Sequence, residues 1–426
     1  RFALYLMGWN RMDECKIKDL TYPGYKDTTG WIGIPDSGHA GQLMLLEHYR
    51  LTGDRFSRDA VERLGLRGRA YAWKGLKGKD PDKDASLMSD NRYAAWPLFN
   101  SLQGASLTGD KKQLEEARQV MLTYRNAVRY SPIGWMCLTV NDKGSPEVYG
   151  RNYPEDKRGP GASVVYANFQ FGLVVIALSK YYEETGDEEA RDTILATCDM
   201  LVSRSMLRTK EGKPAGWTYC WGDVWGANGT GQGDWNDDVI AAVGYGYRVS
   251  GRPEFLEALK AGYEETKTEY RPFSQVGYAC VVHPRTDQVP PAAVTKLDAD
   301  ALGNGEVKLT WRAPGDDGAK GRAALYQVKY SKVKMVERVT DWPPPGVDVP
   351  ADKTGYRKLA DEHRTKVCSF YQAMNVTGEP EPKPAGDKES FTLKGLTPGK
   401  YWIALKSFDA AQNMSDISNV VEVEVK

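Results

Sequence analysis

The residues best suited to acid–base chemistry are His39 and the triplet Asn91-Arg92-Tyr93. His39 lies in the first turn of a predicted helix, where the positive end of the helix dipole disfavours imidazolium and keeps the ring neutral near pH 7. A neutral imidazole can act as a general base. Arg92 or Asn91 can neutralise a carboxylate while Tyr93 acts as an acid or base. The structural alternative is that these polar residues only cap or pack their helices.

A second polar group is rich in aromatic residues and precedes a helix predicted from Val239. Its members are Trp221, Asp223, Trp225, Asp234, Trp235, Asn236, Asp237 and Asp238. The indole rings can stack on a sugar, and the carboxylates can supply a general acid or bind calcium through oxygen. The alternative is an N-capping loop, with Asp237 or Asp238 as the cap. The spacing does not match an EF-hand, so we assign no metal site and expect no cofactor, with calcium left open.

A repeated turn organises the elements that must hold these residues. YRLTGD at 49–54 is echoed by ASLTGD at 105–110, YEETGD at 182–187 and, more weakly, YRVSGR at 247–252. Each copy lies between two apolar runs of helical spacing. In the first copy Gly53 is placed to take the left-handed conformation that ends a helix, with Asp36 as the N-cap of that helix. Helical hairpins that repeat about every 50–80 residues indicate an array or a closed α/α toroid.

Composition excludes several kinds of partner. The 57 Lys and Arg residues balance the 57 Asp and Glu residues, so no net field favours nucleic acid. The longest apolar run, 171–178, is far too short to cross a bilayer. Many of the 12 Trp and 24 Tyr residues lie in Gly-rich, non-periodic segments, which is typical of surfaces that stack sugars. The six cysteines show no metal-type spacing, and Cys198 lies on an apolar helix face as a core thiol.

From Pro290 onward the helical period gives way to strand alternation. Strands are predicted at 307–313, 325–331, 389–396, 400–409 and 419–426. The segments PPAAVTKL, VKLTWRAPGDDG and FDAAQNMSDISN, with LTPGKY at 396–401, resemble a fibronectin type III domain in which Tyr401 is the corner tyrosine. An insertion at about 332–388 departs from that family. We therefore expect an all-α region at 1–280, a linker at 281–291 and an all-β sandwich at 292–426.

The helical region resembles the C-terminal α/α toroid of exo-rhamnogalacturonan lyase-like proteins. The resemblance rests on DSGH at 36–39, LLEHYRLTGD at 45–54 and AWPLFNSLQGASLTGDKKQLEEA at 95–117. It implies that β-rich domains of the same protein precede Arg1, so that the toroid in this chain is incomplete at its N-terminus. The fibronectin type III tail, with TGEPEPKPAGDKESFTLKGL at 377–396, is also similar to that of large secreted bacterial proteins of this type. This resemblance implies a secreted bacterial protein, at the cell surface or outside the cell.

These features favour a multidomain carbohydrate-active protein, a polysaccharide lyase that acts on acidic pectin-type glycans by β-elimination. In this interpretation His39, Asn91, Arg92 and Tyr93 are catalytic, and Trp221, Asp223, Trp225, Trp235, Asn236 and Asp237 bind the polysaccharide. One alternative is a glycoside hydrolase with two carboxylates, Asp223 and Asp237. Another is a noncatalytic structural protein of the cell surface or extracellular matrix, since a fold by itself does not confer activity.

Overall fold

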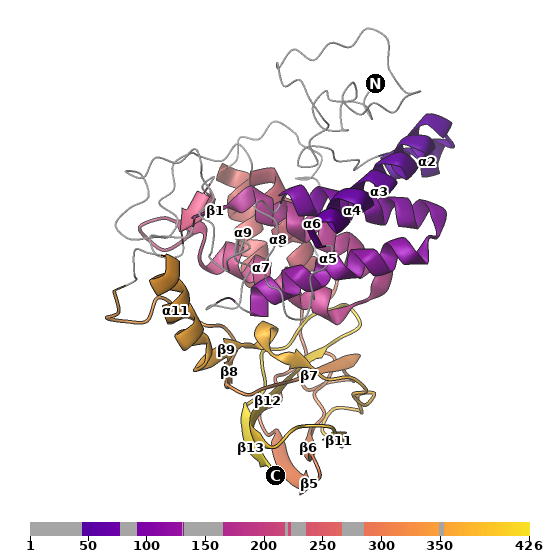
Figure 1. The fold of residues 1–426 in the computed structure, drawn as a ribbon. Helices are drawn as coiled ribbons and strands as arrows, with labels where there is room; N and C mark the ends of the chain where they lie inside the picture. Colours follow the sequence, from indigo (N-terminus) through magenta and orange to yellow (C-terminus); the bar gives the residue numbers. More distant parts are fainter. Residues whose placement is uncertain are drawn as a thin grey trace.

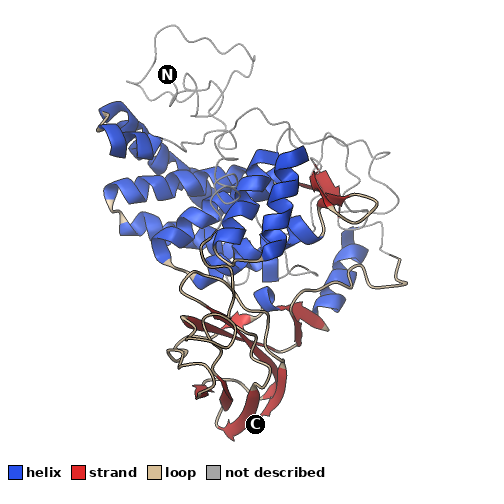
Figure 2. Ribbon diagram, turned by 180° about the vertical axis from the view of Figure 1, so that it is seen from behind, coloured by secondary structure: helices blue, strands red, loops and turns tan. Residues whose placement is uncertain are grey.

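The computed structural model describes residues 45–76, 92–129, 131, 165–217, 220–222, 236–265, 285–348 and 353–426. Helices dominate the described residues up to 265, and mainly antiparallel sheets dominate those from 285 onward (Figures 1 and 2). We call the first part the helical region and the second the β region. The chain thus combines helical and sheet architecture, as its two kinds of hydrophobic period predict.

The helices of the helical region form successive hairpins. Their bounds are α2 Leu45–Thr52, α3 Arg55–Leu76, α4 Arg92–Thr108, α5 Lys111–Arg129, α6 Asn168–Thr185, α7 Glu188–Ser203, α8 Asn236–Arg248 and α9 Pro253–Glu265. The hairpins predicted from the repeated turn are therefore confirmed. The expected helix start at Asp36 lies outside the described residues.

The repeated turn ends its first helix in the same way at each copy. Its glycine has a φ of +70° at Gly53, and the glycines of the other three copies lie between +64° and +73°. This left-handed conformation ends the first helix at little steric cost only for glycine. At the third copy, the Thr185 hydroxyl donates to the Tyr181 carbonyl at 2.8 Å, and the Asp187 carboxylate accepts from the Glu189 amide at 2.9 Å. The threonine thus closes one helix, and the aspartate caps the next.

Helices α6 and α8 lie unusually close together. A Cβ atom on Gly172 of α6 would lie 2.5 Å from the carbonyl oxygen of Asp238 in α8, so only glycine permits this approach. Helix α7 packs against both α6 and α8, and α4 packs against α6 on its other side. The first turns of α6 and α8 are therefore neighbours inside the helical region.

Short strands lie beside these helix starts. The strand β1 (Val165–Ala167) directly precedes α6 and pairs antiparallel with β4 (Cys220–Gly222), with Tyr166 opposite Trp221. A second hairpin joins β2 (Met206–Arg208) to β3 (Pro214–Trp217). The apolar run over 161–184 favours a helix, but the backbone is extended over Val165–Ala167 and the helix begins at Asn168.

Two sheets form the body of the β region. One has the order β10-β7-β12-β13 and the other β11-β6-β5. Their bounds are β5 Asp298–Gly303, β6 Glu306–Arg312, β7 Leu325–Ser331, β10 Met374–Asn375, β11 Lys388–Leu393, β12 Gly399–Phe408 and β13 Val421–Val425. Strands β6, β7, β11, β12 and β13 match the five predicted ones, whereas β5 and β10 were not predicted. Side chains such as Val307, Leu309 and Ile403 meet between the sheets in one apolar core.

The β10-β7-β12-β13 sheet is buried on both faces over β7 and β12. Tyr401, Ile403 and Leu405 face the core between the sheets, while Ala404 and Phe408, on the other face of β12, join the core of the helical region. Residues of the insertion also join that helical core. The insertion contains β8 Lys334–Val336, α11 Lys353–Arg364, β9 Val367–Ser369, the 3-10 helix η2 Phe370–Gln372, and β10. The core of the helical region therefore extends onto β12 and the insertion.

Candidate functional site

The best-defined polar group lies where α6 and α8 begin. Asp237 and Asp238 occupy the first turn of α8 and are only 2% and 7% exposed. Carboxylates are favoured at this position because unsatisfied backbone N–H groups and the helix dipole both attract negative charge. The Gly172 contact places this turn against α6. Two buried acids are thus held at a helix–helix contact.

Two buried amides open the neighbouring helix. Asn168, the first residue of α6, is 1% exposed, and Gln170 is fully buried. Neither polar atom of the Gln170 amide has a hydrogen-bond partner among the described residues. An amide offers both a donor and an acceptor, the pair of functions that a sugar hydroxyl also has. Sequence reasoning missed both residues because their segment is otherwise apolar.

The strand pair β1–β4 brings Trp221 close to the same helix start. Trp221 pairs with Tyr166, which lies two residues before Asn168. Asn236, another predicted binding residue, is the first residue of α8. The backbone thus places Trp221, Asn236 and Asp237 around the neighbouring starts of α6 and α8. This part of the predicted binding group comes together in the fold.

The remaining predicted residues are only partly covered by the structure. Arg92 and Tyr93 form the first turn of α4, the helix that packs on α6. The others lie outside the described residues, namely His39, Asn91, Asp223, Trp225 and Trp235. The roles predicted for the acid–base residues therefore stay predictions.

The thiol predicted for the core lies between α7 and α8. Cys198 of α7 is free and buried, and its Sγ donates to the Ala242 carbonyl of α8 at 3.3 Å. Burial raises the pKa of this thiol far above its ordinary value. Cys198 is thus a packing residue, as its position on an apolar face predicts.

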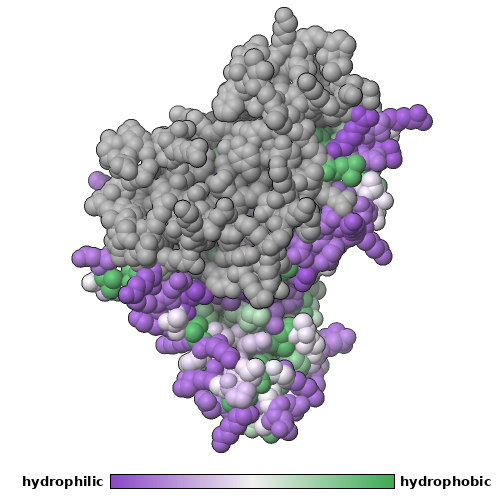
Figure 3. Space-filling view, in the orientation of Figure 1, coloured by the Kyte–Doolittle hydropathy of each residue, from purple (hydrophilic) through white to green (hydrophobic). Residues whose placement is uncertain are grey.

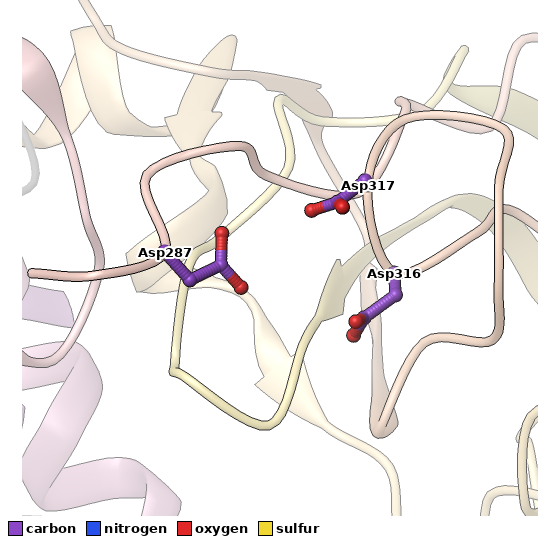
Figure 4. A group of neighbouring side chains, drawn as sticks. All are labelled: Asp287, Asp316 and Asp317. Carbon is purple, nitrogen blue, oxygen red and sulfur yellow. The ribbon is translucent and has the colours of Figure 1, made fainter.

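A separate acidic group lies in the β region. The carboxylates of Asp287, Asp316 and Asp317 approach within 4.8 Å of one another, and those of Asp287 and Asp317 turn toward each other (Figure 4). Oxygen ligands of this kind suit calcium. The sequence expectation for calcium falls instead on the acidic segment before α8, most of which lies outside the described residues. Surface acidic groups of this kind are common without an ion, so we assign no metal here.

On the face shown in Figure 3, hydrophilic residues are interspersed with hydrophobic ones over the described part of the β region. Large apolar side chains are exposed singly, as at Leu51 and Leu302. Among the described helices, none has the length and apolar character needed to cross a bilayer.

Comparison with known proteins gives partial matches. No protein-family model matches the sequence. The chain is 32% identical over 147 residues to mouse calcium-activated chloride channel regulator 1, a match that covers 33% of this chain and 13% of the relative. It is 30% identical over 191 residues to human calcium-activated chloride channel regulator 4, covering 42% and 18%. The chain thus spans less than a fifth of the length of these curated relatives.

Among solved structures, a GH127 β-arabinofuranosidase aligns with 91% of this chain and 72% of its own at 12% identity, with a TM-score of 0.30. A GH127 β-L-arabinofuranosidase from Geobacillus stearothermophilus T6 aligns with 87% and 65% at 12% identity, with a TM-score of 0.28. Scores of this size do not establish a common fold.

Proposed function

We propose that the chain belongs to a secreted, carbohydrate-active protein that cleaves acidic, pectin-type glycans by β-elimination. We place its site where α6 and α8 begin. The observation that carries this proposal is the gathering of two buried acids, Asp237 and Asp238, with two buried amides, Asn168 and Gln170, at one helix–helix contact. Hydroxyl-rich ligands are bound by such mixed sets of donors and acceptors, commonly beside aromatic rings.

The proposed elimination assigns roles to residues around this contact. A base removes the proton α to the uronate carboxylate, a cationic or amide group neutralises that carboxylate, and an acid protonates the leaving oxygen at C4. We assign the base to His39, the neutralising groups to Asn91 and Arg92, and the acid to Tyr93. Arg92 and Tyr93 open α4, which packs against α6, and this supports their placement near the acidic pair.

Hydrolysis is the second candidate, and the burial of Asp237 favours it. A carboxyl shielded from water is suited to protonate a glycosidic oxygen, as general acids of glycoside hydrolases do. Asp223 would then be the second carboxylate. Elimination leaves an unsaturated uronate that absorbs ultraviolet light, whereas hydrolysis leaves a saturated product, so the two reactions are distinguishable.

The finer architecture is also part of the proposal. We propose that the helical hairpins belong to an α/α toroid, supported by the packing of alternate helices α4, α6 and α8 on one another. We propose that the two sheets form a fibronectin type III-like sandwich. In support, the Tyr401 hydroxyl donates to the Thr397 carbonyl at 2.9 Å, the hydrogen bond of a tyrosine corner.

A noncatalytic role at the cell surface is the candidate from a different class. The curated relatives are named as regulators of calcium-activated chloride channels rather than as carbohydrate-active enzymes. Their partial similarity supports this alternative.

The three candidate functions predict different reaction products, so one assay distinguishes them. The purified chain would be incubated with a panel of pectic polysaccharides while ultraviolet absorbance and reducing ends are both measured. Absorbance that rises with the wild type and is lost in His39→Ala supports elimination with His39 as the base. Reducing ends without absorbance indicate hydrolysis, and neither product indicates the noncatalytic role.

A further inference from the structure

A buried ion pair joins the helical region to the β region. Asp192 of α7 and Lys329 of β7 lie 2.6 Å apart, with side chains 6% and 1% exposed. The same carboxylate accepts from the Gln327 amide at 3.0 Å and from the Asn375 amide at 3.1 Å. Asp192 is thus held by three side chains from two adjacent strands, β7 and β10.

A second buried lysine lies on the same sheet face. Lys329 and Lys406 both place their ammonium groups over the ring of Phe370, at 4.9 and 5.4 Å from its centroid. Phe370 comes from the insertion and is fully buried. Lys406 also pairs with Glu337, another residue of the insertion. The insertion therefore covers the outward face of the sheet and provides partners for its buried cations.

A second ion cluster lies further along α7. The Asp199 carboxylate accepts from the guanidinium of Arg338, whose Nε lies at 2.6 Å. The same carboxylate lies 3.3 Å from the guanidinium of Arg252, the residue directly before α9. Arg338 belongs to the insertion, so this cluster also joins both regions. Arg252 in turn donates to Glu254 at 2.7 Å. Asp192 and Asp199 thus anchor the same helix at two points about two turns apart.

The insertion also completes the end of another helix. The Gln372 amide donates to the Arg129 carbonyl at 3.2 Å and to the Ser131 carbonyl at 2.7 Å, at the C-terminal end of α5. Carbonyls at helix ends have no partner within their own helix and need one from outside. The β region therefore contributes hydrogen-bond donors to carbonyls at the end of α5.

We propose that the β region holds α7 in place through the ion pairs of Asp192 and Asp199, an arrangement we call the clamp. We also propose that the helical and β regions fold and unfold as one unit. The extended core of the helical region supports this, since Phe370, Phe408 and Met414 pack among residues of the helices. An appended module joined by a linker would instead keep a polar face between the regions. Because α7 packs on α6 and α8, the clamp also supports the helices that carry Asn168 and Asp237. The proposal does not depend on the proposed function.

Substitutions in the Asp192–Lys329 ion pair can test whether the contact between α7 and β7 couples the two regions. A complete buried pair contributes little net stability, because desolvation offsets the attraction. Removal of one partner is strongly destabilising, because the remaining charge stays buried without compensation. Lys329→Met keeps the length of the side chain and leaves the Asp192 charge in place. Asp192→Asn combined with Lys329→Met removes both charges.

The test follows unfolding in both regions of the whole chain at once. Backbone hydrogen exchange, read by mass spectrometry, reports on α7 and on β6 separately, and thermal unfolding gives the midpoint. We expect Lys329→Met to speed exchange in α7 and β6 by the same factor and to lower a single midpoint by about 5 °C. The double variant should recover most of this loss. Lys400→Met is the matched control, since Lys400 pairs with Glu422 on the exposed edge of the same sheet, and it should change neither region.

Three results would overturn the proposal. The first is faster exchange in β6 with α7 unchanged, and the second is two separate thermal transitions in the wild type. The third is a double variant that is no more stable than Lys329→Met. Should Lys329→Met fail to fold, the double variant decides the question, because the clamp predicts that it folds.

Discussion

Gly172 of α6 and Asp238 of α8 are in backbone contact, since a Cβ atom on Gly172 would lie 2.5 Å from both the carbonyl carbon and the carbonyl oxygen of Asp238. This contact fixes the spacing of the two helix starts that carry the candidate site. It also explains a glycine in the interior of a helix, where alanine would otherwise be preferred by about 1 kcal/mol.

Gly172→Ala tests that contact. The added methyl group must push α8 away from α6, so we expect a loss of about 1–3 kcal/mol in the free energy of unfolding, measured by urea denaturation. Any glycan-cleaving activity should fall further than stability alone explains, because the first turns separate. Gly246→Ala is the control, since it over-packs the same helix against the Cys198 sulfur two turns away. It should cost stability while the folded protein keeps its activity.

The capping of α7 gives a second prediction. Asp187 is its N-cap, and its carboxylate accepts from the Glu189 amide. Asp187→Ala should lower the free energy of unfolding by about 1 kcal/mol, whereas Asp187→Asn keeps an acceptor in place and should lose less. Equal losses in the two variants would mean that the cap bond is not what stabilises this turn.

The buried imidazole of His363 predicts that the stability of the fold depends on pH. Burial lowers the pKa of this imidazole, against the smaller opposing effect of Asp341. A histidine with a lowered pKa in the folded state stabilises the fold above its unfolded pKa of about 6.5, and this stability is lost as the pH falls below that value. We therefore expect the thermal midpoint to drop on acidification from about pH 7. His363→Gln should make this drop smaller, and an unchanged slope would contradict the assignment.

The corner tyrosine gives a prediction for the sandwich. Tyr401→Phe removes the hydroxyl that donates to the Thr397 carbonyl, and we expect a loss of about 1 kcal/mol in the free energy of unfolding. Tyr330→Phe is the matched control, since its ring packs edge-on against Tyr401 at 5.8 Å. A loss of unfolding free energy in Tyr330→Phe as large as that in Tyr401→Phe would show that the corner hydrogen bond contributes no more stability than the Tyr330 hydroxyl.

Local signals in the sequence predict much of the fold. The repeated turn places glycines where a left-handed backbone is needed and aspartates where a cap is needed, and all four glycines adopt that conformation. Strands such as β6 show clean alternation of apolar and polar residues, so their positions are predicted well. Strand β5, DADALG, has only small alanines at the apolar positions of its alternation, and it lies at a sheet edge with most side chains exposed, so its signal is weak.

Tertiary burial is what the sequence does not show. Alternation along β7 places Gln327 and Lys329 on the polar face, which normally meets water. That face is instead covered by α7 and the insertion, and Lys329 is fully buried. The amides Asn168 and Gln170 are hidden for a related reason, since single polar residues in an apolar run give no periodic signal. The close approach of α6 to α8 at Gly172 is what brings them near Asp237.

The measurement that tests the central proposal most directly compares the initial rate of unsaturated-uronate formation in the wild type, Asp237→Asn and Asp59→Asn. The last is the same substitution on the partly exposed surface of α3. A site at the start of α8 predicts product from the wild type and an unchanged rate in Asp59→Asn. In Asp237→Asn, with its fold intact, it predicts a loss of about 10-fold or more, because a charged contact that binds the glycan is removed. A folded Asp237→Asn variant that keeps the wild-type rate would contradict the site, and no product from the wild type would contradict elimination itself.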